Sequence, residues 1–371
     1  MGILQPIWDG TFVYREPVCF SADKDGRPTG GTLLYQPEEI LSVTSFDGSV
    51  FYQPVRDYTA NGRQLVRTEA SRIPYLERSV YCKPFTGVPE TAWVRLSGGK
   101  AYMEVVSDVY RWQTLVTYTH RDKWAGFQPK TCGESLPRSM EKLRADVMAG
   151  GDFHLTLYGD SITAGWEASG CNERAIDMVT LGEYHVSLWH APYQPAWAEL
   201  VTNALQARYP QSNVIKTNRA AGGSTVQWGV EHAAELVPPC KPDLIMLGFG
   251  MNSMQESAED YRRAILSIIR TIRKECHDCE FVLMSPMIPN PEIKGFQNNQ
   301  LPAQQDVLYQ IAAELEGVCI APVHSVFREM TARGKHYLEL TGNCINHPND
   351  FSVRVYAQTV LRTLGVDGND G

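Results

Sequence analysis

The second half of the chain alternates short apolar runs with amphipathic stretches. Five runs have the length and apolar composition of buried strands: 153–158, 213–217, 243–248, 280–285 and 318–321. Apolar residues recur at helical spacing from Trp197 to Leu205, and again from Tyr261 to Ile272 behind a capping box that begins at Ser257. Further helices are predicted over about 302–316 and 352–364. Strands alternating with helices predict a parallel sheet covered on both faces, that is, a three-layer α/β/α domain of flavodoxin-like type.

The first 135 residues follow a different pattern, in which short alternating or aromatic runs are separated by turn signals. Strands are predicted at 10–14, 40–44, 49–52, 92–96, 102–106 and 112–118. Pairs such as Asp25-Gly26 and Asn61-Gly62 between them are typical of tight turns, and no strong helical pattern interrupts them. We therefore predict an all-β, jelly-roll-like sandwich over 1–135, a linker helix within 136–150 and the α/β domain over 151–371.

Composition and charge narrow the range of partners. The 371 residues are 43% hydrophobic and 20% charged, which is ordinary for a globular protein with real cores. A formal charge of −8 argues against a nucleic-acid partner, and no apolar run is long enough to predict a membrane span. The first residues lack the features of a signal peptide, so we expect a cytoplasmic protein, or a secreted one if the natural leader is missing. A homo-oligomer remains open.

The nine cysteines show no framework spacing and are expected to be reduced thiols. Cys276 and Cys279 are separated by two residues, as in zinc and redox sites, but no second pair supplies the further ligands that zinc needs. Their segment lies between a predicted helix and a predicted strand, so a connecting loop is expected. Gly222-Gly223 is too short to cradle a phosphate. The sequence therefore predicts no metal and no cofactor.

Residues suited to chemistry follow three of the predicted strands and precede the last helix. Gly159-Asp160-Ser161 follows the first strand, the loop 218–225 follows the second, and Gly250-Met251-Asn252 follows the third. His347 comes shortly before the final helix. Because the carboxyl ends of parallel strands meet at one edge of a sheet, we expect these loops to lie together.

Acyl transfer requires this set of groups. A serine hydroxyl must lose its proton as it attacks, and a histidine within hydrogen-bond reach can take that proton. The developing oxyanion needs donors that are already in place, typically backbone N–H groups and an asparagine amide. Glycine is a suitable backbone donor because it has no Cβ to obstruct the carbonyl. The four loops supply a serine, a glycine, an asparagine and a histidine in that order.

Residues 150–365 resemble the SGNH (GDSL-type) hydrolase superfamily. The resemblance implies that Ser161 is the nucleophile and that its own N–H is one oxyanion donor. Gly223 would be the second donor, with Gly222 as the alternative by one residue. Asn252 would supply a side-chain donor, and His347 would be the general base.

Two positions depart from the pattern of that superfamily. Ser253 stands where an aspartate usually follows the asparagine, which should not affect catalysis. Cys344 stands where the triad aspartate is usual, three residues before the histidine, and a thiol cannot orient imidazole as a carboxylate does. The orienting group could be Asp350, Asn343, Asn346 or a backbone carbonyl, and a Ser-His dyad is favoured over a conventional triad. Asp160 is expected to be a structural residue of the turn.

The pairing of a sandwich with such a hydrolase resembles microbial carbohydrate acetylesterases of the acetylxylan type. This resemblance implies a serine esterase that removes O-acetyl groups from acetylated oligo- or polysaccharide. Trp166 and Trp189 in the insertion 166–192, together with Trp228, are candidate substrate contacts, although aromatic residues there could equally pack the insertion. The alternatives are a short-chain aryl or lipid-derived esterase and, in another class, an inactive carbohydrate-binding protein.

Overall fold

The second half of the chain forms a five-stranded parallel sheet, as predicted. The computed structural model describes residues 3–84, 101–103, 109–145 and 151–366. The strand order is β13 (Val214–Asn218), β10 (Phe153–Gly159), β14 (Leu244–Gly248), β15 (Glu280–Met284) and β16 (Val318–Ala321). The strands β14, β15 and β16 are fully buried and mostly apolar because both faces of the sheet are covered, whereas the edge strand β13 is only partly buried.

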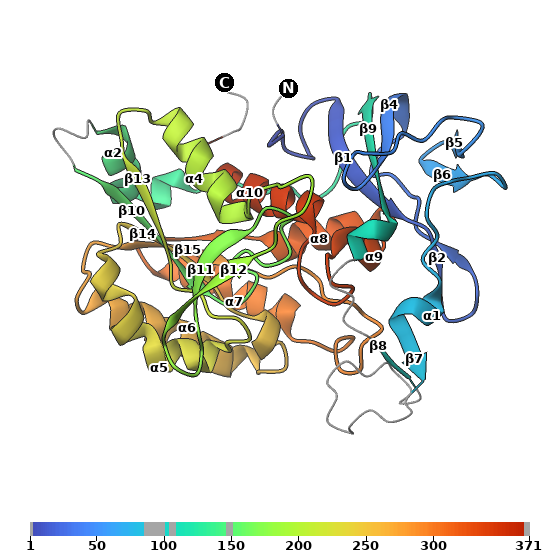
Figure 1. Ribbon diagram of the computed structural model, residues 1–371. Helices are drawn as coiled ribbons and strands as arrows, with labels where there is room; N and C mark the ends of the chain where they lie inside the picture. The colour runs from blue at the N-terminus through green and yellow to red at the C-terminus, as the bar shows by residue number, and fades with distance from the viewer. Residues whose placement is uncertain (1–2, 85–100, 104–108, 146–150, 367–371) are drawn as a thin grey trace.

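Helices cover both faces of this sheet, which makes the three-layer α/β/α sandwich expected from the sequence (Figure 1). One face carries α4 (Trp197–Arg208), α8 (Val323–Ala332) and α10 (Asp350–Leu364). The other carries α5 (Val226–Leu236), α6 (Ala258–Arg273) and α7 (Leu301–Glu314). The sequence analysis did not identify α5 and α8.

Short elements complete the description. The predicted linker helix is α2 (Pro137–Arg144). The small helices are α1 (Arg78–Tyr81), α9 (Tyr337–Leu340) and the 3₁₀ turns Val109–Trp112, Gly133–Ser135, Pro238–Cys240 and Met251–Ser253. Within the described ranges, none of the helices combines the length and apolar character needed to cross a membrane.

The N-terminal region consists mostly of antiparallel strands, consistent with the predicted β-sandwich. Its main sheet has the order β1 (Phe12–Cys19), β9 (Gln113–His120) and β4 (Pro37–Ser45). Three antiparallel strand pairs accompany it in the described residues: β2 (Ser21–Ala22) with β3 (Pro28–Thr29), β5 (Tyr58–Asn61) with β6 (Gln64–Arg67), and β7 (Cys82–Pro84) with β8 (Ala101–Met103). The strand predicted at 92–96 lies outside the described residues, and the run 49–52 contributes one isolated bridge at Phe51.

The N-terminal sheet packs directly against α10 and the small helix α9 through β1 (Figure 1). One hydrophobic cluster contains side chains from both regions, for example Val116 of β9 and Tyr356 of α10. Lys335 is fully buried at the contact, with Nζ 2.9 Å from Oε1 of Glu16 and 3.4 Å from Oε2 of Glu339. The two regions therefore share a core. The domain boundary between residues 135 and 151 stays a prediction.

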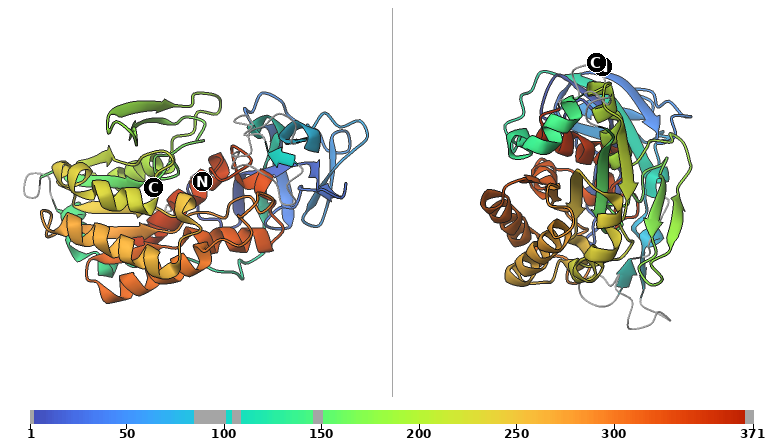
Figure 2. Two further views of the ribbon diagram at one scale, coloured as in Figure 1. Left: turned by 90° about the horizontal axis from the view of Figure 1, so that it is seen from below. Right: turned by 90° about the vertical axis from the view of Figure 1, so that its left-hand side faces the viewer.

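A hairpin follows the first loop of the α/β domain. It consists of β11 (Asn172–Ile176) and β12 (Glu183–Ser187), and it stands away from the helical layers in Figure 2. A parallel bridge joins Ile176 to Ala221, and the indole N–H of Trp228 donates to the carbonyl of Met178 at 3.2 Å. These contacts hold the hairpin against the glycine-containing loop that follows β13.

Candidate active site

Ser161 and His347 form the centre of the site. Ser161 begins the turn after β10, and its Oγ lies 2.8 Å from Nε2 of His347, in the loop before α10. Both residues are largely buried, with exposed fractions of 5% and 9%. A serine hydroxyl at this distance from an imidazole nitrogen can transfer its proton as it attacks, which is the chemistry expected from the sequence.

The turn that presents Ser161 is held by its neighbours. Oδ1 of Asp160 accepts hydrogen bonds from the backbone N–H groups of Ile162 and Thr163, at 3.0 and 3.4 Å. Burial raises the pKa of Asp160 to about 6. A side chain at Gly159 is excluded, because its Cβ would lie 2.2 Å from the carbonyl oxygen of Gly248. Asp160 is thus a structural residue of the turn, as expected.

Hydrogen bonds join the loops after β10, β13 and β14. The carbonyl of Gly159 accepts from the N–H of Ala221 at 2.9 Å and from Oγ of Ser224 at 3.0 Å. The N–H of Val226 donates to Oγ of Ser253 at 2.8 Å. Ser253, which departs from the usual aspartate, therefore supports the loop that it faces. The predicted meeting of these loops at one edge of the sheet is found.

The predicted oxyanion donors lie on these joined loops. Gly223 has a φ of +79°, a left-handed conformation that favours glycine. Gly222 is crowded, because a Cβ there would lie 2.7 Å from Cζ2 of Trp166. The amide of Asn252 donates to the carbonyl of Ser224 at 3.0 Å, which brings this exposed residue beside the glycine loop. The roles of Gly223 and Asn252 as donors stay predictions.

The loop that carries His347 is held by its own asparagine. Oδ1 of Asn343 accepts from the N–H groups of Ile345, Asn346 and His347, at 2.9, 3.0 and 3.1 Å. Its amide donates to Oδ1 of Asn346 at 3.2 Å. Asn343 and Asn346 therefore shape the backbone of the loop, and these bonds engage their side-chain oxygens within the loop itself. Cys344 is buried with a φ of +64°.

The N-terminal sheet also contacts this loop. The buried side chain of Gln113, at the start of β9, donates to the carbonyls of Leu338 and Thr341, each at 2.8 Å. Its Oε1 accepts from the amide of Asn349 at 3.1 Å. Thr341 and Asn349 flank the histidine segment. A residue of the N-terminal region thus fixes both ends of the loop that bears His347, and no local sequence pattern indicates this contact.

Asp350 was one of several alternatives for orienting His347, and in the structure its carboxylate is bound by another residue. Its carboxylate accepts from the N–H of Ser169 at 2.8 Å and from Oγ of Ser169 at 2.7 Å. Burial raises the pKa of Asp350. The carboxylate that does face the ring is that of Glu167, with Oε1 3.6 Å from Nδ1 of His347. In the sequence, Glu167 is distinguished only by its place shortly after the nucleophile turn, and its spacing from His347 does not indicate this contact.

The three tryptophans proposed as substrate contacts have different surroundings. The ring of Trp166 meets that of His347 edge-on, with centroids 5.6 Å apart, so it borders the site. Trp189 is 65% exposed and lies beside the half-exposed ring of Tyr193, with centroids 5.2 Å apart. Trp228, on α5, is buried in the hydrophobic cluster that α5 and α6 share, which leaves no open ring face for stacking. Burial therefore assigns Trp228 to packing.

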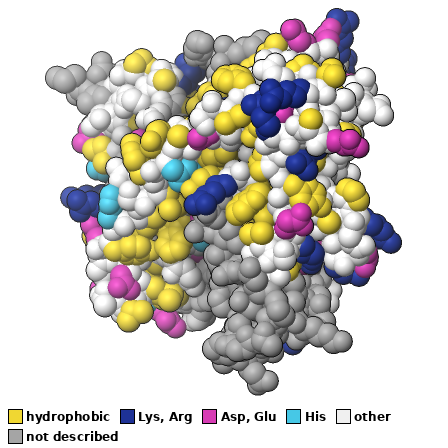
Figure 3. Space-filling view, turned by 45° about the vertical axis from the view of Figure 1, so that its right-hand side comes forward, with side chains coloured by type: hydrophobic (Ala, Val, Ile, Leu, Met, Phe, Trp, Pro, Cys, Tyr) yellow, Lys and Arg dark blue, Asp and Glu magenta, His cyan; other side chains and the backbone are white. Residues whose placement is uncertain are grey.

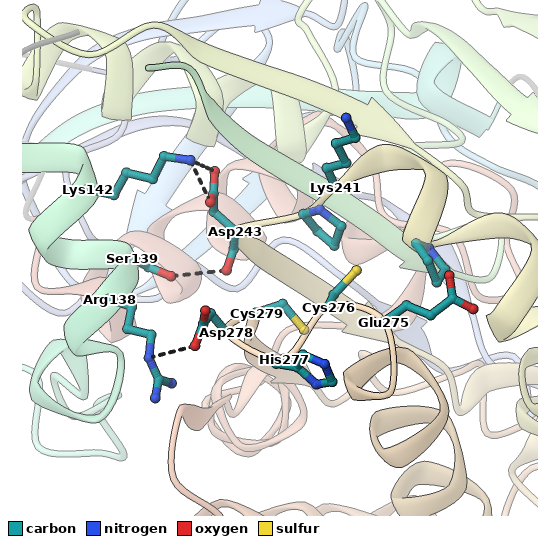
Figure 4. Close-up of a pocket in the computed structure, with 12 residues that line it drawn as sticks. Arg138, Ser139, Lys142, Lys241, Asp243, Glu275, Cys276, His277, Asp278 and Cys279 are labelled. Carbon is teal, nitrogen blue, oxygen red and sulfur yellow. Dashed lines mark hydrogen bonds and ion pairs between the residues drawn. The ribbon is translucent and has the colours of Figure 1, made fainter. Parts of the chain in front are cut away.

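A separate cavity of about 770 Å³ lies at the amino ends of β14 and β15, away from Ser161 (Figure 4). Cys276 and Cys279 line it from the loop between α6 and β15, as predicted, and both are free thiols. Nζ of Lys142 lies 2.7 Å from each carboxylate oxygen of Asp243 at its edge. In the described part of the chain, no three His, Cys, Asp or Glu side chains are arranged to hold a metal ion.

Comparison with known proteins connects the fold and the site to one family. The model of the GDSL-like lipase/acylhydrolase family matches residues 157–352, just over half of the chain. No curated protein matches the sequence.

Several solved structures of esterases and hydrolases are similar to part of this chain. The acetylxylan esterase Axe2 from Geobacillus stearothermophilus is 20% identical, with a TM-score of 0.44 over 57% of this chain and 94% of its own. An α/β hydrolase from the metagenome of Lake Arreo, Spain, is 20% identical, with a TM-score of 0.44. The match covers 58% of this chain and 97% of that hydrolase. A two-domain esterase active on acetylated mannans is 19% identical, with a TM-score of 0.46. The match covers 62% of this chain and 53% of that esterase.

Proposed function

Because this chain belongs to the GDSL-like lipase/acylhydrolase family, we propose that it is a serine esterase that removes acetyl groups from acetylated carbohydrate. The observation that carries the proposal is the contact of 2.8 Å between Oγ of Ser161 and Nε2 of His347. Both side chains lie at the edge of the sheet where ligands of open α/β folds bind.

The reaction proceeds through an acyl-enzyme. Ser161 attacks the ester carbonyl as its proton passes to Nε2 of His347, and the developing oxyanion is bound by the N–H groups of Ser161 and Gly223. An amide carries two N–H donors, so Asn252 can bind Ser224 through one and the oxyanion through the other. His347 then gives its proton to the sugar oxygen as its bond to the acyl carbon breaks, which releases the sugar hydroxyl. A water molecule next attacks the acyl-enzyme as its proton passes to His347, and His347 returns a proton to the oxygen of Ser161 as acetate leaves.

The surroundings of the site favour a short acyl group. Trp166 lies against the ring of His347 on one side and against Gly222 on the other. On this proposal, the bulky ring beside His347 limits the length of the acyl group that the site accepts. The exposed pair Trp189 and Tyr193, on the same insertion, presents aromatic surface of the kind that stacks on sugar rings. Both features support an acetylated saccharide as the substrate.

A second candidate is a short-chain aryl or lipid-derived esterase. The tip of the β11–β12 hairpin exposes Met178 and Val179, with exposed fractions of 38% and 83%. A Cβ at Gly223 would lie 4.0 Å from Cε of Met178, so this apolar tip borders the predicted oxyanion site. An apolar alcohol or aryl group could bind there.

The experiment compares substrates directly. Purified protein is incubated with acetylated xylo-oligosaccharides, acetylated manno-oligosaccharides and p-nitrophenyl esters of rising chain length. We expect acetate release from at least one saccharide, preference for acetate over octanoate, and no turnover by Ser161→Ala. Preference for octanoate, with no acetate released from any sugar, would refute the carbohydrate proposal and favour the second candidate.

A further inference from the structure

The second nitrogen of the histidine faces a carboxylate that lies directly after the nucleophile turn. Nδ1 of His347 makes no hydrogen bond with any other described residue. Oε1 of Glu167 lies 3.6 Å from it, and the two side chains are only 13% and 11% exposed. The carboxylate of Glu167 is therefore placed beside the nitrogen that Ser161 does not contact, and both side chains are largely shielded from water.

The backbone is shaped to place Glu167 there. Glu167 has a φ of +70°, a left-handed conformation that costs free energy for a residue other than glycine. Gly342 leaves the space that the side chain fills, because a Cβ at Gly342 would lie 2.9 Å from Cβ of Glu167. The N–H of Gly342 donates to the carbonyl of His347 at 2.9 Å. The left-handed backbone of Glu167 and the absence of a side chain at Gly342 together let the carboxylate lie beside His347.

The other acidic groups near the site have different partners. Ser169 binds both oxygens of Asp350. Asp160 also acts electrostatically on His347, but its Oδ1 caps the nucleophile turn by accepting from Ile162 and Thr163. Glu167 is therefore the carboxylate placed to act on Nδ1.

We propose that Glu167 is the positioning residue for His347, and this inference rests on the proposed esterase function. When Ser161 gives its proton to Nε2, the imidazolium carries a positive charge, and the carboxylate stabilises that charge and holds the ring in the productive tautomer. No proton passes to Glu167. The 3.6 Å separation contracts to a hydrogen bond as the charge forms, since catalytic hydrogen bonds are often long before substrate binds. A glutamate from the nucleophile loop thus takes the place of the missing aspartate at Cys344.

The test compares Glu167→Gln with Glu183→Gln. Both remove one carboxylate from the insertion that follows the nucleophile turn, but Glu183 binds Arg219 and does not face the histidine. Glu167→Gln should lower kcat for p-nitrophenyl acetate by about 10²–10⁴-fold with little change in KM. The acidic limb of its kcat/KM profile should move to lower pH, because a neutral amide no longer favours the imidazolium. Glu183→Gln should match the wild type in both.

Each outcome separates this inference from the proposed function. Wild-type kcat and an unmoved acidic limb in folded Glu167→Gln would overturn the role of Glu167 while leaving the esterase intact. An inactive wild type would instead refute the proposed function.

If Glu167→Gln does not fold, the wild type itself provides the measurement. A proton NMR spectrum at acidic pH should contain a far-downfield imidazole N–H resonance that is missing in His347→Gln. Absence of that resonance from the folded wild type would overturn the proposal.

Discussion

Replacing Gln113 by leucine tests whether the N-terminal sheet supports the proposed catalysis at His347. The leucine keeps a similar volume but removes two hydrogen bonds to Leu338 and Thr341 and one from Asn349. At about 1 kcal/mol for each net hydrogen bond, the loss of stability is about 3 kcal/mol. Thr341 and Asn349 flank the histidine segment, so the loss of these bonds should let His347 move away from Ser161. A displacement of His347 of about 1 Å should lower kcat by up to about 10²-fold.

Gln358→Leu is the matched control. Gln358 is a buried glutamine at the same contact between the two regions, where its Oε1 accepts from Ile7 and its amide donates to Gln5. Its replacement removes two hydrogen bonds, about 2 kcal/mol, but none of them holds the histidine loop. It should therefore lower stability and leave kcat unchanged.

The assay measures urea unfolding by tryptophan fluorescence, and kcat on p-nitrophenyl acetate under conditions where each variant is folded. The expected result is reduced stability in both variants and reduced kcat in Gln113→Leu alone. Equal kcat values for folded Gln113→Leu and the wild type would refute the reasoning that the first domain positions the histidine loop.

Three further predictions concern single residues. Asn252→Ala should lower kcat by about 10²–10³-fold with little effect on KM if its amide binds the oxyanion; a near-normal rate would remove it from that role. Trp189→Ala should raise KM for acetylated oligosaccharides and leave p-nitrophenyl acetate unaffected, whereas equal effects on both would argue against a sugar platform. Burial raises the pKa of Asp160 from 3.8 to about 6, so the folded state holds this proton more tightly than the unfolded state does. Its contribution to stability is full below about pH 4 and is lost as the pH rises through about 6. The urea midpoint of Asp160→Asn should therefore fall less over this range than that of the wild type, and parallel profiles would contradict this.

The parallel sheet could be predicted because most of its strands are buried on both faces and appear as short apolar runs in the sequence. The parallel topology also predicts that Ser161 and the loops with Gly223 and Asn252 lie at the carboxyl edge of the sheet, because each follows one of its strands. Helix α5 was missed because it begins directly after the glycine loop and contains Gly229, which weakens its helical pattern. On the face shown in Figure 3, acidic and basic side chains are interspersed, an arrangement that net charge alone cannot indicate.

The support of His347 could not be predicted from sequence spacing. Asp350 lies three residues after His347 in the sequence, but its carboxylate accepts hydrogen bonds from Ser169 instead. That contact depends on how the insertion packs against the start of α10. Glu167 reaches the ring through a left-handed backbone and the gap at Gly342, two features that only the folded chain reveals. Gln113 contributes from another domain. Local patterns thus indicated the candidate reacting groups, whereas the contacts that support them depend on tertiary structure.

The central claim is that Ser161 is the nucleophile of an acyl-transfer site. A fluorophosphonate, which reacts with activated serine hydroxyls, tests it most directly when the modified peptide is mapped by mass spectrometry. The account predicts one label per chain on Ser161, loss of esterase activity at the same rate as labelling, and no label in Ser161→Ala. A label on another residue, or full activity after Ser161 is modified, would contradict it.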